Sequence, residues 1–159
     1  MNPCPCGFYG DPYHACTCSP GLVARYQQRI SGPFLDRVDI FIEVPHIDYE
    51  KLTDNRLGEK SEGVRNRVKA ARLRQQVRFR GTRLASNAEM TSAEVREFCQ
   101  TEESAQSLLK TAMKQLYLSA RAFHRILKLA RTVADLENTE TIKSNHLAEA
   151  IQYRPRNQV

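Results

Sequence analysis

Long apolar runs are missing from this chain of 159 residues. No stretch approaches the roughly 20 apolar residues that a membrane-spanning helix needs, and no basic start followed by an apolar stretch indicates an export signal. The hydrophobic share of 41% is enough for one ordinary domain or two small lobes. We therefore expect a mostly helical protein with no membrane segment, located in the cytoplasm.

The motifs of a stand-alone ATPase or hydrolase are also missing. No segment matches the phosphate-binding pattern G-x-x-x-x-G-K-[ST], and Gly58–Ser61 (GEKS) has the wrong spacing and neighbours. Serine, histidine and aspartate residues are scattered without the setting of a nucleophilic triad. The chain is therefore not expected to hold a triphosphate or to act as a hydrolase by itself.

Positive charge is present but unevenly placed. The chain has 24 Lys and Arg against 18 Asp and Glu, a net charge of +6. Between Val64 and Ala88 there are eight basic residues and no acidic one: Arg65, Arg67, Lys69, Arg72, Arg74, Arg78, Arg80 and Arg83. This segment presents a local positive field to a phosphate-bearing partner, although an acidic protein surface would suit it equally.

Four of the five cysteines fall in the first 18 residues, as C-x-C-x9-C-x-C. They are Cys4, Cys6, Cys16 and Cys18, and Cys99 stands alone. A clustered quartet without an export signal favours a structural zinc site over a disulfide framework, with unligated or redox-pairing cysteines as the alternative. His14 is a spare candidate ligand.

Hydrophobic periodicity predicts the elements. A short helix is expected in 21–30 and a strand in Phe34–Pro45, where alternate apolar residues share one face. From about Ser61 onward the pattern is helical. Thr91 and Glu94 predict a capping box, and further helices are expected over 105–116, from Ser119 to Leu136, and around Leu147–Ile151. Val64, Val68 and Ala71 give the basic segment an apolar edge, so we expect a helix with its arginines facing outward.

Basic residues at two places in the chain have alternative interpretations. Arg121, Arg125 and Lys128 are spaced by four and three, so they share a helix face that is ordinarily solvated. Arg37 comes just before the predicted strand, where its planar guanidinium suits a phosphate, while a local pair with Asp36 or Asp39 is the simpler interpretation.

Five segments together carry a resemblance to a known family. In chain order they are NPCPCGFYGDP (2–12), CTC (16–18), RISGPFLDRVDIFIEVP (29–45), LSARAFHRILKLARTVADLE (118–137) and HLAEAIQYR (146–154). The chain resembles, over nearly its whole length, the C-terminal half of the magnesium-chelatase-like AAA+ ATPases of the ComM/YifB type. The resemblance implies an α+β fragment that is predominantly α-helical, with strands from the end of the AAA+ core followed by a helical-bundle lid.

The resemblance also implies a domain organisation and site residues. Residues 1–47 correspond to the end of the AAA+ core, 48–60 to a linker and 61–159 to the lid. Asn2 matches the sensor-1 asparagine, which orients the attacking water, and Arg37 matches the arginine finger that enters a neighbour's site. Arg29 is a second candidate for that intersubunit role. Arg121, in LSAR, matches the sensor-2 arginine of the lid, which contacts the γ-phosphate of bound ATP.

By this resemblance, the complete protein uses ATP and Mg²⁺, forms a homo-oligomeric ring, most often a hexamer, and acts on DNA as a helicase or in branch migration. The phosphate-binding half of the AAA+ core would be an essential partner of this chain. A different interpretation is a zinc-stiffened basic module that binds nucleic acid or protein without nucleotide. A subunit of a true metal chelatase is a third, although the resemblance implies that chelatases lack the C-x-C pairs here.

Overall fold

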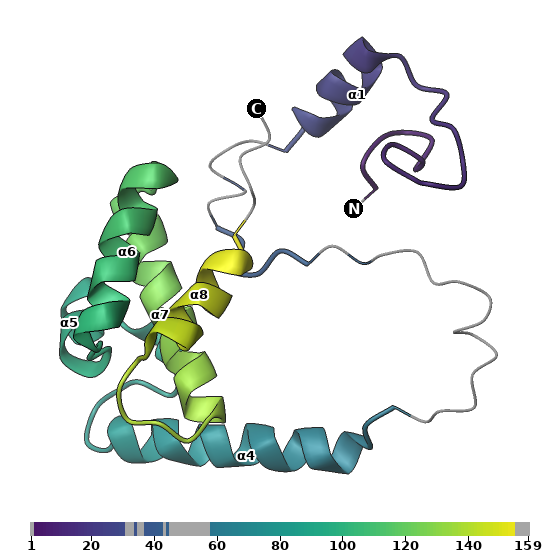
Figure 1. Ribbon diagram of the computed structural model, residues 1–159. Coiled ribbons are helices and arrows are strands. Elements are labelled where there is room, and N and C mark those ends of the chain that lie inside the picture. Colours follow the sequence, from purple (N-terminus) through teal and green to yellow (C-terminus); the bar gives the residue numbers. More distant parts are fainter. Residues whose placement is uncertain (1, 31–33, 35–36, 43, 45–57, 155–159) are drawn as a thin grey trace. The chain divides into compact units, whose positions relative to one another are not determined.

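The structure is a computed structural model that describes residues 2–30, 34, 37–42, 44 and 58–154 (Figure 1). The described residues fall into two compact units. One contains the residues up to Val38 together with Val44, and the other contains Asp39–Ile42 and the residues from Gly58 onward. Most of the predicted linker 48–60 lies outside the described residues. No helix in the described part is long and apolar enough to cross a bilayer.

The first unit consists of a turn-rich loop and one short helix, α1 (Pro20–Gln27). Pro20 at the first helical position fits the start of a helix, because its missing N–H would have no partner there. Val23 is the buried side chain of α1, and the Gln27 side-chain amide donates to the Pro3 carbonyl at 3.2 Å. The predicted short helix is therefore confirmed, and it is tied to the first residues of the loop.

The second unit is the helical one, in which α7 is the central helix. Its elements are α4 (Ser61–Arg78), the 3₁₀ turn η1 (Asn87–Glu89), α5 (Ser92–Phe98), α6 (Glu103–Gln115), α7 (Ala120–Leu136) and α8 (Ser144–Gln152). α7 contacts α4, η1, α5 and α8, and α6 packs against α8. The prediction of a predominantly α-helical chain is confirmed.

The helix boundaries follow the local signals in the sequence. The Glu94 amide donates to the Thr91 hydroxyl at 3.5 Å, and the Thr91 amide donates to the Glu94 carboxylate at 2.6 Å, which confirms the predicted capping box of α5. The Ser119 hydroxyl caps α7 by accepting from the Ala122 amide at 3.2 Å. α7 then buries its apolar stripe in a common core that includes Ile126, Ala130, Ala134, Ile142 and Leu147.

The strand predicted in Phe34–Pro45 is corrected by the structure. Residues 37–42 and Val44 are not in a strand, and Phe34 lies in a helical turn. A strand needs a neighbouring strand to accept its backbone hydrogen bonds, and the described residues contain none. The Phe41 amide instead donates to the Tyr153 carbonyl at 2.8 Å. The one β-bridge in the described part joins Thr101 to Ile142, in the loops that precede α6 and α8.

A buried polar network joins α4, η1 and the end of α7. The Asp135 carboxylate is fully buried and accepts from the Arg78 guanidinium at 2.9 Å and from the Asn87 amide at 2.8 Å. It also accepts from Arg131 Nε at 3.2 Å, and the Arg131 side chain is 1% exposed. Arg131 further donates to the carbonyls of Thr139 and Glu140, just beyond the end of α7.

This network corrects the expectation that all arginines of the basic helix face outward. Arg78 turns inward to Asp135, and Arg74 donates to the Asp135 carbonyl at 3.0 Å and to the Asn138 side chain. Although burial raises the pKa of Asp135, hydrogen bonds from Arg78 and Asn87 hold that pKa below its usual range. The carboxylate is therefore charged at neutral pH.

We predict that Asp135→Ala destabilises the helical unit by about 3–5 kcal/mol, because it leaves buried guanidinium groups without their counter-charge. The measurement is urea unfolding followed by circular dichroism at 222 nm. Glu59→Gln is the matched control, since it removes the exposed ion pair with Arg67 and should leave the unfolding midpoint unchanged. Equal midpoints for Asp135→Ala and the unmodified chain would contradict a stabilising role for the network.

Candidate functional site

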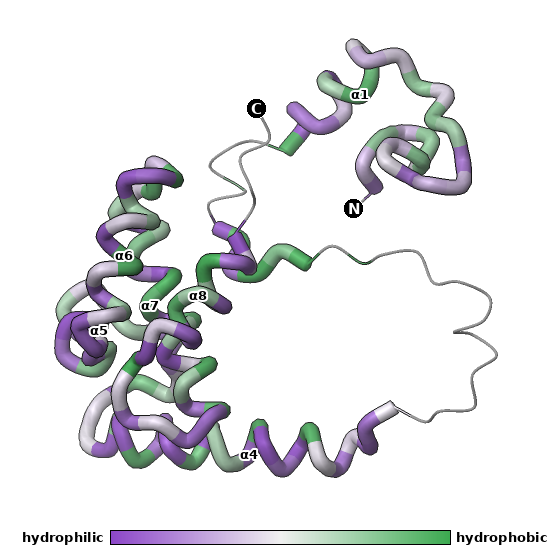
Figure 2. The backbone as a smooth tube through the Cα atoms, in the orientation of Figure 1, coloured by the Kyte–Doolittle hydropathy of each residue, from purple (hydrophilic) through white to green (hydrophobic). Residues whose placement is uncertain are grey.

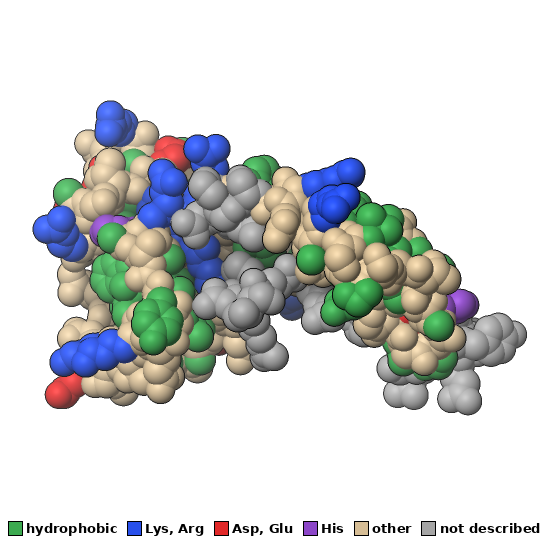
Figure 3. Space-filling view, turned by 90° about the horizontal axis from the view of Figure 1, so that it is seen from above, with side chains coloured by type: hydrophobic (Ala, Val, Ile, Leu, Met, Phe, Trp, Pro, Cys, Tyr) green, Lys and Arg blue, Asp and Glu red, His purple; other side chains and the backbone are tan. Residues whose placement is uncertain are grey.

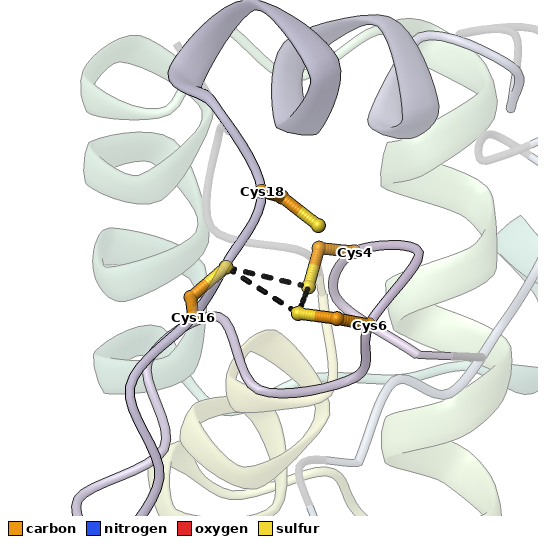
Figure 4. Close-up of side chains that lie close together, drawn as sticks. All are labelled: Cys4, Cys6, Cys16 and Cys18. Atoms are coloured by element: carbon orange, nitrogen blue, oxygen red, sulfur yellow. Dashed lines mark hydrogen bonds between the residues drawn. The ribbon is translucent and has the colours of Figure 1, made fainter.

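Four cysteine sulfurs converge in the first unit (Figure 4). The Sγ atom of Cys4 lies 3.3 Å from that of Cys6 and 3.7 Å from that of Cys16, and the sulfurs of Cys6 and Cys16 are 3.6 Å apart. With Cys18 included, all four sulfurs lie within 4.8 Å of one another. Cys4 is fully buried and the other three are half-buried.

Tight turns in the loop produce this convergence. The Gly7 amide donates to the Cys4 carbonyl at 3.1 Å, and Gly7 has a φ of +88°, a conformation that glycine adopts without a steric penalty. The Asp11 carboxylate accepts the backbone amides of Tyr13 and His14 at 2.7 and 2.8 Å. These turns bring the second cysteine pair back against the first.

His14 does not join the cysteine cluster. Its ring stacks on Phe8 with the centroids 4.9 Å apart, and its Nδ1 atom lies 3.6 Å from the Asp11 carboxylate. The group of potential metal ligands in this part of the chain consists of Cys4, Cys6, Cys16 and Cys18. The structure thus brings together the four cysteines that the sequence predicted and leaves out the spare candidate.

The thiols of the cluster differ in acidity. The backbone amide of Phe8 and the thiol of Cys4 lower the pKa of Cys6 to about 5. A backbone contact to Cys18 lowers the pKa of Cys16, but desolvation and the neighbouring Cys6 and Cys4 together raise it to about 12. Desolvation and the same two neighbours raise the pKa of Cys18 despite a backbone contact at Cys6. One thiolate therefore suppresses the ionisation of the others, and a bound cation would remove that repulsion.

The geometry and the donor set fit a tetrahedral metal centre. Four sulfurs around Zn²⁺, each about 2.3 Å from the ion, would be about 3.8 Å apart. The three sulfur–sulfur distances of 3.3 to 3.7 Å are close to that value. Four protein ligands fill the coordination sphere of zinc and leave no open position for substrate. The cluster is therefore compatible with a structural zinc ion.

The other predicted site residues of the first unit are on its surface. Asn2 is exposed and lies beside the turn at Gly7, whose added Cβ would be 3.8 Å from the Asn2 side-chain nitrogen. Arg37 is exposed, and its backbone amide donates to the Phe34 carbonyl at 2.9 Å. The Arg37 side chain has no hydrogen-bond or ion-pair partner among the described residues. Arg29 lies over the Tyr26 ring, 5.8 Å from its centroid.

Arg121 belongs to the helical unit, in the first turn of α7. It is exposed, and its guanidinium has no hydrogen-bond or ion-pair partner in the described part of the chain. The first turn of α7 contains no acidic residue. The positive end of the helix dipole and the Arg121 charge therefore reinforce one another, which favours an anion at this end of the helix.

Arg125, one turn further along α7, is not simply solvated. Its guanidinium lies 3.2 Å from the Asp39 carboxylate, and its side chain is 24% exposed. Asp39 is the first residue of the segment Asp39–Ile42. The same segment is also attached to the helical unit by the hydrogen bond from the Phe41 amide to the Tyr153 carbonyl. The sequence offers Asp39 as a partner of Arg37, and its contact with α7 has no local signal because Arg125 lies far along the chain.

Comparison with known families gives the class of the chain. The family described as magnesium chelatase, subunit ChlI C-terminal, matches residues 58–154, and the family described as magnesium chelatase, subunit ChlI, matches residues 1–52. The first match covers more than half of the chain and contains all of α4 to α8. The chain belongs to this magnesium-chelatase-like family.

Individual relatives narrow the class to the ComM/YifB type. The chain is 41% identical to the YifB protein of Escherichia coli K12 over 155 residues, and 42% identical to the competence protein ComM of Haemophilus influenzae over 156 residues. Each match covers 97% of this chain and 29% of the relative. The YifB protein of Salmonella typhimurium is 39% identical over a similar span. The chain thus spans less than a third of the length of these relatives.

We predict that Cys6 is the most reactive thiol of the metal-free chain. Its lowered pKa makes it a thiolate at pH 7, whereas the raised pKa values of Cys16, about 12, and of the buried Cys99, about 11, keep both protonated. The measurement is iodoacetamide labelling at pH 7 with a chelator present, followed by mass spectrometry of the peptides. Labelling of Cys16 at the same rate as Cys6 would contradict this order of acidity.

Proposed function

We propose that the chain forms the C-terminal part of an AAA+ ATPase motor that processes DNA, as a helicase or in branch migration. The observation that carries the proposal is Arg121 at the start of α7, which has no partner among the described residues, in a chain that belongs to the magnesium-chelatase-like family. In this proposal the chain does not hydrolyse ATP alone, because its sequence contains no phosphate-binding loop.

Arg121 takes the sensor-2 role in this proposal. A γ-phosphate near the start of α7 would gain the guanidinium charge, the unpaired amides of the first turn and the helix dipole together. Within the first turn, the Ser119 hydroxyl satisfies the Ala122 amide. Because α7 is also the central helix of the helical unit, a change in its position with nucleotide state would move its neighbours as well.

Asn2 and Arg37 take the sensor-1 and arginine-finger roles. Both are exposed, and no described residue pairs with the guanidinium of Arg37, which supports a role in another subunit's site. A finger supplied to a neighbour requires a ring, which we propose is a homo-hexamer in the complete protein. There, bound ATP and Mg²⁺ supply the transferred phosphoryl group and neutralise its charge, and Arg37 would stabilise the charge that develops on it. Arg29 is a second candidate for this intersubunit role.

Zinc is the proposed occupant of the cysteine cluster. Cys4, Cys6, Cys16 and Cys18 would hold it as a structural ion, which would fix the loop that begins with Asn2. Thiolate sites of this kind persist where cysteines stay reduced, so we propose a cytoplasmic location.

A specific observation also favours the alternative function, a zinc-stiffened module that binds nucleic acid or protein without nucleotide. Arg65, Lys69 and Arg72 are exposed on α4 and need no ATP to attract a polyanion. Lys and Arg side chains also outweigh Asp and Glu on the face of the helical unit away from α4, which Figure 3 shows. The two functions differ in whether nucleotide changes the binding of DNA by the complete protein.

We predict that Arg121→Ala, in a full-length ComM/YifB-type protein carrying this chain, lowers ATP turnover on the order of 100-fold or more with the fold unchanged, since it removes a charge directed at the phosphate. The measurement is steady-state phosphate release, with circular dichroism to check the fold. Arg96→Ala is the matched control, because Arg96 is an exposed arginine of α5 outside the proposed site. Turnover equal to that of the control would remove Arg121 from the sensor role.

We predict close to one zinc ion per purified chain. The double substitution Cys16→Ser and Cys18→Ser should release it and increase amide hydrogen exchange in the first 20 residues, while the exchange of α4 to α8 stays unchanged. Elemental mass spectrometry measures the metal content. Cys99→Ala is the control, because Cys99 lies in the helical core and should not affect zinc. A chain that contains no zinc when purified without chelators would leave the cysteines as spare or redox-active groups.

A further inference from the structure

The first half of α4 is exposed on all sides within the described part of the chain. None of the residues 61–70 is buried, and burial begins at Ala71, where the helix reaches α7. Figure 1 shows these first turns extending beyond the other helices of the unit, and Figure 2 shows that they are mostly hydrophilic. Since no described residue buries this half of α4, its surface is accessible to a partner.

The basic residues of α4 divide into two groups. Three of them are engaged by the fold: Arg67 pairs with Glu59 in a bidentate contact that includes a 2.8 Å bond, and Arg74 and Arg78 bind the end of α7. The other three, Arg65, Lys69 and Arg72, are exposed and have no hydrogen-bond or ion-pair partner among the described residues.

The three unengaged cations share one face of the helix. Spacings of four and three residues at about 100° per residue place Arg65, Lys69 and Arg72 within an arc of about 60°, over a rise of about 10 Å. Gln76, also exposed, continues the same line one turn further. We call Arg65, Lys69, Arg72 and Gln76 the basic stripe. The only carboxylate within α4 is Glu62, in its first turn.

We infer that the basic stripe binds the sugar-phosphate backbone of a nucleic acid. Its side chains are of the types that contact phosphate oxygens, and none of them is apolar. A protein interface has an apolar centre, whereas the centre of the stripe is charged. The exposed apolar side chains of α4 flank the stripe without interrupting it: Val64 and Val68 on one side, Leu73 and Val77 on the other. The inference rests on the DNA part of the proposed function and adds the surface that makes the contact, which requires no nucleotide.

The test compares two triple variants of the whole chain. One is Arg65→Gln, Lys69→Gln and Arg72→Gln. The control is Arg96→Gln, Lys110→Gln and Lys114→Gln, which removes the same charge from exposed positions of α5 and α6. Glutamine resembles Lys and Arg in helix propensity, so both variants should fold, as circular dichroism will verify. Binding is measured by fluorescence anisotropy with labelled single-stranded and duplex DNA between 50 and 200 mM salt.

Three phosphate contacts contribute a slope of about −2.7 to the plot of log affinity against log salt concentration on duplex DNA. Raising salt fourfold should therefore weaken the unmodified chain and the control roughly 40-fold more than the stripe variant. At low salt the stripe variant should also bind more weakly than the control.

Three results would overturn the inference. Equal affinities and salt slopes for the two variants would place the DNA contact elsewhere and leave the DNA role standing. If the unmodified chain binds no DNA, both the stripe contact and a DNA-binding role for this part of the protein are wrong. The proposed ATP role would still be tested separately, by the turnover of Arg121→Ala. If the stripe variant instead changes the sedimentation of the chain, with DNA binding equal to the control, the stripe contacts a second copy.

Discussion

The buried carboxylate of Asp135 is the constraint on which the helical unit depends. A charge removed from water is tolerated only when its partners are fixed around it, and here the partners come from α4, η1 and α7 itself. Apolar packing along α7 would allow α4 to slide or rotate, because hydrophobic contacts are not directional. The paired hydrogen bonds from Arg78 determine which residues of α4 turn inward and therefore which remain outside.

Local structure could be predicted from the sequence, and long-range polar contacts could not. The capping box at Thr91 and the boundaries of α7 depend on residues three or four apart, so their patterns are readable in the chain. Arg131 and Asp135 resemble an ordinary surface pair at i and i+4, although they interrupt the apolar stripe of a buried helix. Only the fold brings Arg78 to them. The predicted strand failed for the same reason, because a strand requires partners that its own sequence does not contain.

The candidate site residues also differ in whether a local sequence pattern predicts them. The four cysteines were predictable as a cluster because two short pairs joined by turns must meet, and the structure places their sulfurs together. The roles proposed for Asn2, Arg37 and Arg121 rest on family resemblance alone, since an exposed asparagine or arginine has no local signature of catalysis. Arg125 shows that a shared helix face does not predict which arginine forms an ion pair. It shares a helix face with Arg121, yet it binds Asp39 while Arg121 is unengaged among the described residues.

The proposed nucleotide contact and the attachment point of α4, which carries the proposed DNA contact, lie toward opposite ends of α7. Arg121 is in its first turn and Asp135, which holds α4, is in its last, about 20 Å apart along the helix axis. A straight helix transmits rotation and translation without needing a chain of side-chain rearrangements between its ends. If nucleotide state repositions Arg121, the network at Asp135 obliges α4 and its basic stripe to move with α7 as one body. Coupling between ATP and DNA would then require only a rigid lid with two positions, which is the physical condition for linking two distant sites.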